Sequence, residues 1–312
     1  MVSPSLPPGA RYLELLGGAD LSVLAVAAGR SAASDDEARA WFAADPSRVE
    51  AALNDDATFE RLFGSAGLLA GPETVAAPEG ALEQAELLAR VSPFLVFAVA
   101  VNRGVIDLFT RQFIEERIGP HRRIPVFDTA GVREFCVDPW RRLFLVEHLA
   151  SYTKVRSGPI WVQRGQRWQR RRFSELDPAR LAGLLEVLPE EEHSGVYRRL
   201  GDLALFMTGV FPDHTARRAA HPIEVERLVR SLPAGSGGAP TRDELGALVG
   251  DRGIGGLLGY LGPRWYRAAA SSAPLPGSRR LLSEVADGFD HARRFLTLVA
   301  DRFLFPFRQQ WA

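Results

Sequence analysis

Recurrent helix-start signals constrain this sequence more than any other feature. Two segments, Ser34 to Glu37 and Thr241 to Glu244, fit a capping box, in which a hydroxyl and a glutamate three residues later each accept a backbone N–H. Three aspartates stand directly before a proline, which supplies an N-cap acceptor and a preset φ: Asp45, Asp138 and Asp177. Few alternating β patterns compete with these signals. We therefore predict a mainly α-helical fold.

Three long helices are predicted from the spacing of apolar residues. One runs from about residue 81 to 117 with a kink at Pro93, and one covers about 139–154 and is apolar on nearly every side. The third, about 278–305, has apolar residues at alternating spacings of three and four: Leu282, Val285, Phe289, Ala292, Leu296, Val299 and Phe303. Such a seam is typical of a helical bundle. We expect a bundle-like body interrupted by one β-hairpin.

Two glycine-rich and proline-rich segments suggest the domain organisation. Residues 71–80 predict a linker, which separates a small helical N-terminal region, 1–70, from a main helical domain, 81–312. Residues 231–240 predict a flexible loop within that main domain. A chain of 312 residues is long enough for one large domain or two ordinary ones.

Composition and local hydropathy narrow the class of protein. A hydrophobic fraction of 46% with 24% charged residues is that of a globular protein, not a disordered or fibrous one. The apolar run from Val91 to Val101 is too short to span a bilayer, and no signal peptide is visible. The single cysteine, Cys136, cannot form an internal disulfide, and its thiol is either reactive or simply buried. We expect a cytoplasmic protein without a membrane span.

Residues 159–173 break the helical pattern and predict a β-hairpin around Gly165. Seven basic residues and no acidic residue lie between Lys154 and Phe173, and two tryptophans lie among them. Guanidinium groups pair with phosphate and stack on rings, while indoles offer stacking surfaces. We predict that the hairpin binds an anionic partner, nucleic acid or an acidic protein surface, through these residues: Arg156, Trp161, Arg164, Arg167, Trp168, Arg170, Arg171 and Arg172.

A purely structural role for the hairpin stays open. Formal net charge is zero, and arginine outnumbers lysine by 37 to one throughout the chain, so the number of arginines is weak evidence by itself. The period-two alternation of a strand could turn both tryptophans into the core and leave the arginines on a solvated face. The acidic stretch around Glu186 and Glu190–Glu192 could also neutralise the hairpin within the fold.

A second candidate site lies in the predicted helix 139–154. Glu147 falls on an apolar helical face, where a carboxylate must be paired, hydrogen-bonded or protonated. Together with His148, Tyr152 and Asn102 it could form an acid–base or ligand pocket. The alternative is a core glutamate bonded to one of the many arginines.

Other patterns give no recognisable catalytic or cofactor motif. The glycine-rich run 253–259 does not match G-x-G-x-x-G, because Leu258 stands at the third glycine's position, and it predicts a turn leading into a short helix. Glu284, Asp287, His291 and Arg294 share a helical face that predicts a solvated, salt-bridged stripe rather than a metal site. We expect neither a cofactor nor a metal.

These features favour a non-enzymatic binding or regulatory protein that uses the hairpin as its contact surface. One alternative is an enzyme or small-ligand binder with a pocket at Glu147, His148, Tyr152 and Asn102. Another is a structural or assembly subunit that uses its long helices in oligomer contacts.

Overall fold

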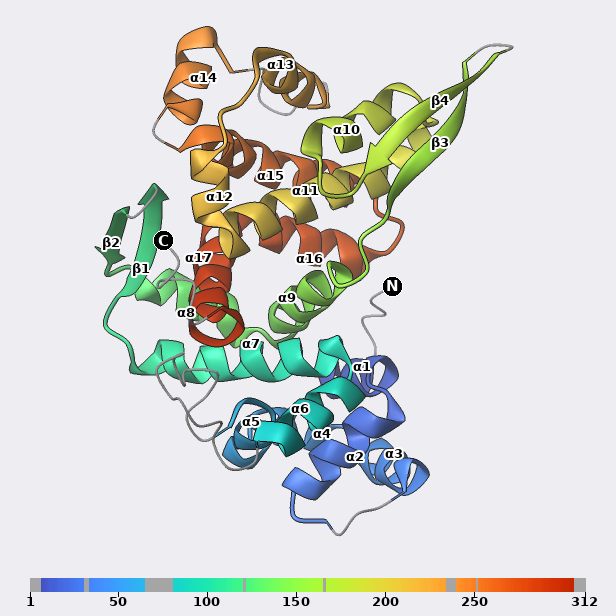
Figure 1. Cartoon of the computed structure of the whole chain (residues 1–312), viewed down its shortest axis with the longest axis vertical. Coiled ribbons are helices and arrows are strands. Elements are labelled where there is room, and N and C mark those ends of the chain that lie inside the picture. Colours follow the sequence, from blue (N-terminus) through green and yellow to red (C-terminus); the bar gives the residue numbers. More distant parts are fainter. Residues whose placement is uncertain are drawn as a thin grey trace. The chain divides into compact units, whose positions relative to one another are not determined.

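The computed structural model confirms a mainly α-helical chain with a β-hairpin (Figure 1). It describes residues 7–30, 34–64, 81–119, 122–164, 167–233, 240–250 and 252–305. These residues contain seventeen α-helices and two antiparallel two-stranded sheets, β1–β2 and β3–β4. The β3–β4 sheet is the predicted hairpin. The β1–β2 sheet was not expected from the sequence.

The described residues form two compact units, each made of separate stretches of chain. Unit 1 contains Phe113–Phe135 and Lys154–Thr297, and unit 2 contains Pro4–Gln112, Cys136–Thr153 and Leu298–Ala312. The predicted linker at 71–80 lies outside the described residues, as do positions 234–239 of the predicted loop. The division into residues 1–70 and 81–312 therefore stays a prediction.

Unit 2 consists of helices that pack around α7 and α9. Its elements are α1 (Pro8–Leu15), α2 (Gly18–Ala27), α3 (Asp35–Ala44), α4 (Ser47–Leu53), α5 (Asp56–Phe63), α6 (Ala81–Arg90), α7 (Pro93–Thr110), α9 (Pro139–Ser151) and a π-helical turn, η4 (Ala300–Leu304). Helix α7 contacts α4, α5 and α9. Leu95, Ala98 and Val101 of α7 are completely buried, as are Leu145 and Val146 of α9, as expected for core helices.

Helix α7 is also apolar enough to be tested as a membrane span. By length and composition it could cross a bilayer, with 18 residues of mean hydropathy 1.5, and it is the one such helix in the described part of the chain. A core helix passes the same test. Its Arg103 pairs with Asp56 of α5, and its Asp107 pairs with Arg302 of η4 at 3.2 Å. With its charged residues bound to neighbouring elements, α7 is no clear membrane span.

The prediction of one kinked helix from 81 to 117 was wrong. The chain breaks between α6 and α7, where Ser92 caps α7 by accepting the backbone N–H of Leu95 at 3.2 Å. The Ser92 hydroxyl in turn donates to the carboxylate of Asp20 at 2.7 Å, which fixes the break against α2. Pro93 follows as the first helical residue, where its missing N–H costs nothing. The chain then leaves the helix after Thr110 and enters β1.

Unit 1 is organised around α11 and α15, which pack along each other. Its elements are β1 (Ile114–Gly119), β2 (Arg122–Val126), α8 (Thr129–Val137, as far as Phe135), β3 (Ser157–Arg164), β4 (Arg167–Ser174), α10 (Pro178–Ala182), η2 (Gly183–Glu186), η3 (Glu190–Glu192), α11 (His193–Val210), α12 (Pro212–Arg217), α13 (Pro222–Arg230), α14 (Arg242–Val249), α15 (Gly253–Ser272), α16 (Pro276–Asp287) and α17 (Phe289–Val299, as far as Thr297). The run 253–259 thus opens a 20-residue helix rather than the short one predicted.

Large buried side chains join these helices. Trp265 and Tyr266 of α15 are completely buried. The Tyr266 hydroxyl donates to Asp202 of α11 at 2.8 Å, and the Trp265 indole N–H donates to Ser231 at 3.0 Å. Both rings therefore contribute apolar area while their polar atoms remain hydrogen-bonded.

The predicted helix 278–305 is divided, although its seam is correct. Helix α16 ends at Asp287, and α17 begins at Phe289. Between them, a Cβ on Gly288 would lie 2.5 Å from the ring of Phe135, so the ring's position requires glycine. All seven predicted seam residues, from Leu282 to Phe303, are buried.

Most of the predicted helix starts are confirmed. Both capping boxes form, and Asp138 accepts two backbone N–H groups at the start of α9. Asp177 caps α10 by accepting the N–H of Arg180 at 3.0 Å. Asp45 is not the N-cap residue, because α4 begins at Ser47, one residue later than predicted. Its carboxylate accepts the backbone N–H of Ser47 from outside the helix.

Two glycines of α11 provide a test of the α11–α15 packing. A Cβ on Gly201 would lie 2.8–2.9 Å from the buried ring of Tyr266, whereas one on Gly195 would meet nothing within 4 Å. We expect Gly201→Ala to destabilise the protein by about 1–3 kcal/mol through overpacking. Gly195→Ala should be neutral or stabilising by up to about 1 kcal/mol, since alanine favours a helix. Equal midpoints of thermal unfolding for the two variants would contradict this packing.

Candidate functional site

The β3–β4 hairpin has a regular register that places its tryptophans on one face. Trp161 pairs with Arg170, and Pro159 pairs with Arg172. Residues directly opposite in an antiparallel pair point to the same side, and side chains alternate along each strand. Trp161, Trp168, Arg170 and Arg172 therefore share one side of the hairpin, and we name these four residues the Arg/Trp face.

The Arg/Trp face is open to solvent. Trp161 is 63% exposed and Trp168 is 64% exposed, which excludes the alternative that both are core residues. Arg170 and Arg172 are exposed, and neither forms an ion pair with another residue that the structure describes. The same holds for Arg156 at the base of β3. The side chains of Arg164, Arg167 and Arg171 lie outside the described residues.

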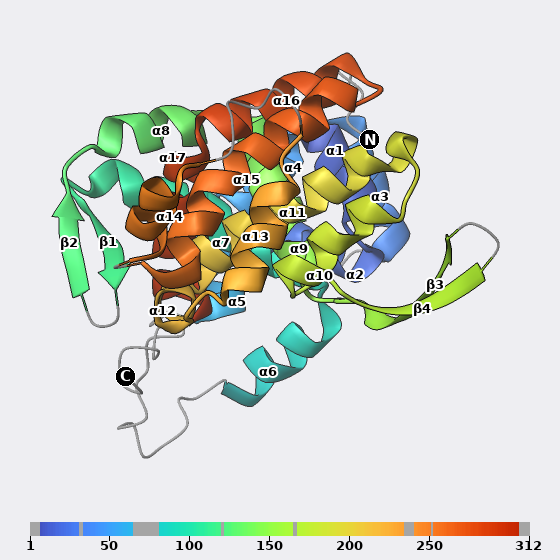
Figure 2. The same cartoon turned by 90° about the horizontal axis from the view of Figure 1, so that it is seen from above.

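The hairpin is fixed at its base and extends beyond the helices of unit 1 (Figures 1 and 2). Glu175, just after β4, accepts the backbone N–H of Arg156 at 2.9 Å and pairs with Arg199 of α11 at 3.3 Å. Strand β4 also packs on α10. Among the described residues, Arg156, Arg170 and Arg172 form no ion pair with the acidic stretch 186–192, so that stretch does not neutralise these three arginines.

Of the residues of the second candidate, His148 and Asn102 are buried in unit 2, whereas Glu147 and Tyr152 are half-buried. Glu147 accepts hydrogen bonds from Arg11 at 3.2 and 3.3 Å, which is the arginine-bound alternative. His148 is buried between the rings of Phe144 and Tyr152, at centroid distances of 6.1 and 5.5 Å. These are contacts of helix packing.

Two other polar side chains, Asn102 and Cys136, are buried in unit 2. The amide of Asn102 donates to the carbonyl of Ala98 within its own helix at 2.8 Å. Cys136 is completely buried, and burial raises the pKa of its thiol well above the ordinary value. A thiol that stays protonated is a weak nucleophile, so the buried alternative for Cys136 is favoured over the reactive one.

A polar cavity in unit 1 was not predicted. It has a volume of about 240 Å³ and lies between β1, α11, α12, α14, α15 and α17. Its polar lining is supplied by these residues: Arg117, Thr208, Thr215, Arg252, Tyr260, Asp290 and Arg293. Gly255 and Gly256 of the run 253–259 also line it. A Cβ at Gly256 would lie 1.8 Å from the carbonyl oxygen of Leu248, so this glycine is required for helix packing.

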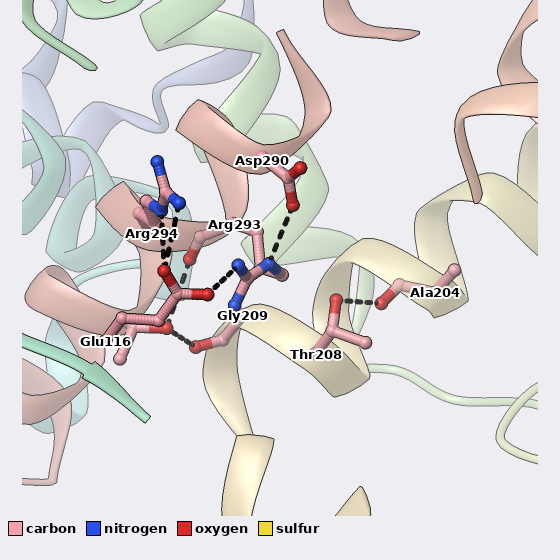
Figure 3. Close-up of polar contacts among 8 residues, drawn as sticks. Glu116, Ala204, Thr208, Gly209, Asp290, Arg293 and Arg294 are labelled. Atoms are coloured by element: carbon pink, nitrogen blue, oxygen red, sulfur yellow. Dashed lines mark hydrogen bonds and ion pairs between the residues drawn. The ribbon is translucent and has the colours of Figure 1, made fainter. Parts of the chain in front are cut away.

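Two residues of the cavity lining, Asp290 and Arg293, belong to a buried ion cluster (Figure 3). Glu116 of β1 is 5% exposed and binds two arginines of α17, Arg293 and Arg294, the latter at 3.0 Å. Arg293 also pairs with Asp290 at 3.2 Å. Burial raises the pKa of Glu116, but the two guanidinium charges outweigh burial and lower it below the ordinary value of 4.5.

The sequence contained a signal for this cluster that was misinterpreted. Asp290, Arg293, Arg294 and Thr297 recur at the i, i+3, i+4, i+7 spacing of one helical face. The sequence predicts Arg294 on a solvated stripe, but its side chain is 20% exposed and pairs with buried Glu116 of β1. Thr297 likewise donates to the carbonyl of Gly209 in α11 at 2.7 Å.

The ion cluster makes the stability of the protein depend on pH. Glu116→Gln leaves Arg293 and Arg294 without their shared carboxylate, and we expect it to destabilise the protein by about 3 kcal/mol at pH 7. Because the folded-state pKa of Glu116 is lowered, this stabilisation is present above its unfolded-state pKa and is lost as the pH falls through the folded value. Calorimetric unfolding midpoints of wild type and variant should therefore converge between pH 7 and pH ~3.

Glu115→Gln is the matched control. Glu115 neighbours Glu116 in β1 but is 52% exposed and pairs with Arg123 on the surface. Its removal should change stability by less than about 1 kcal/mol. A loss as large as that of Glu116→Gln, or a constant difference at every pH, would argue against the cluster.

Comparison with known proteins gives no relative for this chain. No protein-family model, no curated protein and no solved structure matches it. Its own side chains are therefore the basis for inferring its function.

Proposed function

We propose that this protein binds single-stranded nucleic acid through the Arg/Trp face. The observation that carries the proposal is the exposure of two tryptophans beside two arginines on one side of a projecting hairpin. Flat indole rings that are more than half exposed can stack with any base, whatever its sequence. The neighbouring guanidinium groups can pair with phosphates.

Several features of the hairpin support this role over that of a solvated structural element. Arg170 and Arg172 have no carboxylate partner among the described residues, so binding to phosphate would break no described ion pair. The segment from Lys154 to Phe173 contains no acidic residue that would repel a polyanion. The Glu175–Arg199 pair holds the base, so the face is presented without ordering a loop on binding.

Single strands fit better than a duplex because bases must be unstacked to reach the indoles. Trp168 is the diagonal neighbour of Trp161 across the two strands, since it lies two residues from Arg170, the partner of Trp161. Diagonal neighbours lie roughly 7–8 Å apart at their Cα atoms. Two successive bases of a flexible strand could reach both rings.

The test measures binding of the full chain to a fluorescent oligothymidylate across a salt series. Trp161→Ala with Trp168→Ala should weaken binding by about 1–3 kcal/mol per stacked base, with little change in salt dependence. Arg170→Ser with Arg172→Ser should instead reduce the slope of log K against log salt by about 1.4, since each phosphate contact on a single strand contributes about 0.7.

The β1–β2 hairpin provides a matched control. Phe127, just after β2, is 71% exposed, and Arg122 in β2 is exposed, so Phe127→Ala with Arg122→Ser removes a similar pair elsewhere on unit 1. This variant should bind as wild type does. Absence of binding by wild type at low salt would exclude the proposal. Binding of polyglutamate that requires the arginines but not the tryptophans would point instead to an acidic protein partner.

A further inference from the structure

The cavity of unit 1 gathers positive charge from separate elements. Arg117 comes from β1, Arg252 from the residue before α15, and Arg293 from α17. Three guanidinium groups around about 240 Å³ form an arrangement that suits a phosphate group, because each can donate two hydrogen bonds to its oxygens. We propose that this cavity binds the phosphate group of a small phosphorylated molecule, a function separate from that of the hairpin.

The charge balance around the cavity supports an anion. Arg117 pairs with Asp213, and Arg293 with Glu116 and Asp290, and Asp290 itself lines the cavity. Arg252 is exposed and forms no ion pair with a residue in the described ranges. With Arg294 included, four arginines stand against three carboxylates among the described residues, which leaves one positive charge uncompensated in this set, that of Arg252.

The carboxylates also fix the guanidinium groups in position. The side chain of Arg117 is 5% exposed and that of Arg293 is 11% exposed, so both are enclosed and oriented before a ligand arrives. A guanidinium has five N–H donors and can bind a carboxylate and a phosphate together. Arg293 and Arg117 can therefore keep their pairs with Glu116 and Asp213 and still donate to an anion in the cavity.

The start of α15 adds to the positive potential of the cavity. Helix α15 begins without a side-chain cap, and Gly255 in its first turn lines the cavity. The N–H of Ile254 in this turn already donates to the carbonyl of Arg218 at 3.2 Å, so the contribution to anion binding comes from the helix dipole. This feature supplements the arginines rather than defining the site.

The size of the cavity limits the ligand. Pockets for drug-sized ligands have volumes of roughly 300–1,000 Å³, so about 240 Å³ suits a phosphate on a small organic body. The guanidinium of Arg264 lies 3.5 Å above the ring of Tyr260, the aromatic residue of the lining. With one ring face covered in this way, Tyr260 is poorly placed to stack on a nucleobase. The ligand class is therefore a phosphorylated molecule smaller than a nucleotide.

The experiment is calorimetric titration of the full chain with inorganic phosphate and with glycerol 3-phosphate, at constant ionic strength in chloride. Wild type should bind both, and acetate should bind more weakly because it has fewer oxygens and less charge. Arg252→Ser should weaken phosphate binding about tenfold, a typical loss for a charge-assisted hydrogen bond. Arg252→Glu should abolish binding, and Arg252→Lys should restore part of it. Since Arg252 is exposed and unpaired among the described residues, these variants should fold normally.

Two controls locate the site. Arg242→Ser removes an exposed arginine at the start of α14, outside the cavity lining, and should leave phosphate affinity unchanged. Arg170→Ser with Arg172→Ser should also leave it unchanged. The proposal is overturned if wild type binds neither probe, if Arg252→Glu binds as wild type does, or if only the hairpin variant loses binding.

Discussion

The buried carboxylate of Glu116 is the interaction on which the architecture of unit 1 depends. It joins β1, from the stretch Phe113–Phe135, to α17, near the end of the stretch Lys154–Thr297. The next residue, Arg117, pairs with Asp213 of α12. Two adjacent residues of one short strand thus bind two helices that are far apart in sequence. Because Arg117 and Arg293 also line the cavity, the same ion pairs shape the proposed phosphate site.

The two proposed sites differ in the way they are prepared for binding. Two of the three cavity arginines, Arg117 and Arg293, are enclosed and oriented by carboxylates, so a ligand meets two sets of donors that have already lost their conformational freedom. The Arg/Trp face is instead exposed, and its order comes from the strand register and from the Glu175 contacts at its base. The first arrangement suits a small ligand of fixed geometry, and the second suits a flexible chain.

Local chemistry explains which parts of the fold were predictable. Capping at Ser34 and Asp138 depends on residues within three positions, and the α16–α17 seam depends on a helical period, so both could be derived from sequence. Strand β1 could not be derived from sequence, because Glu115 and Glu116 continue a helix-like polar pattern after α7. Only pairing with strand β2 makes them part of a sheet. The cavity was missed for the same reason. Arg252 lies more than a hundred residues after Arg117, and Arg293 lies about forty residues after Arg252. Only tertiary packing brings the three side chains together.

The exposed tryptophans are the strongest argument against a purely structural hairpin. A tryptophan can bury about 150–250 Å². Leaving 63% or 64% of each residue in water therefore forgoes on the order of 3 kcal/mol per residue at about 25 cal/mol per Å². Arginine or threonine at these positions would serve a solvated strand equally well without that loss. A partner that covers both rings would recover the energy, and the exposed arginines beside them are the reason for proposing an anionic one.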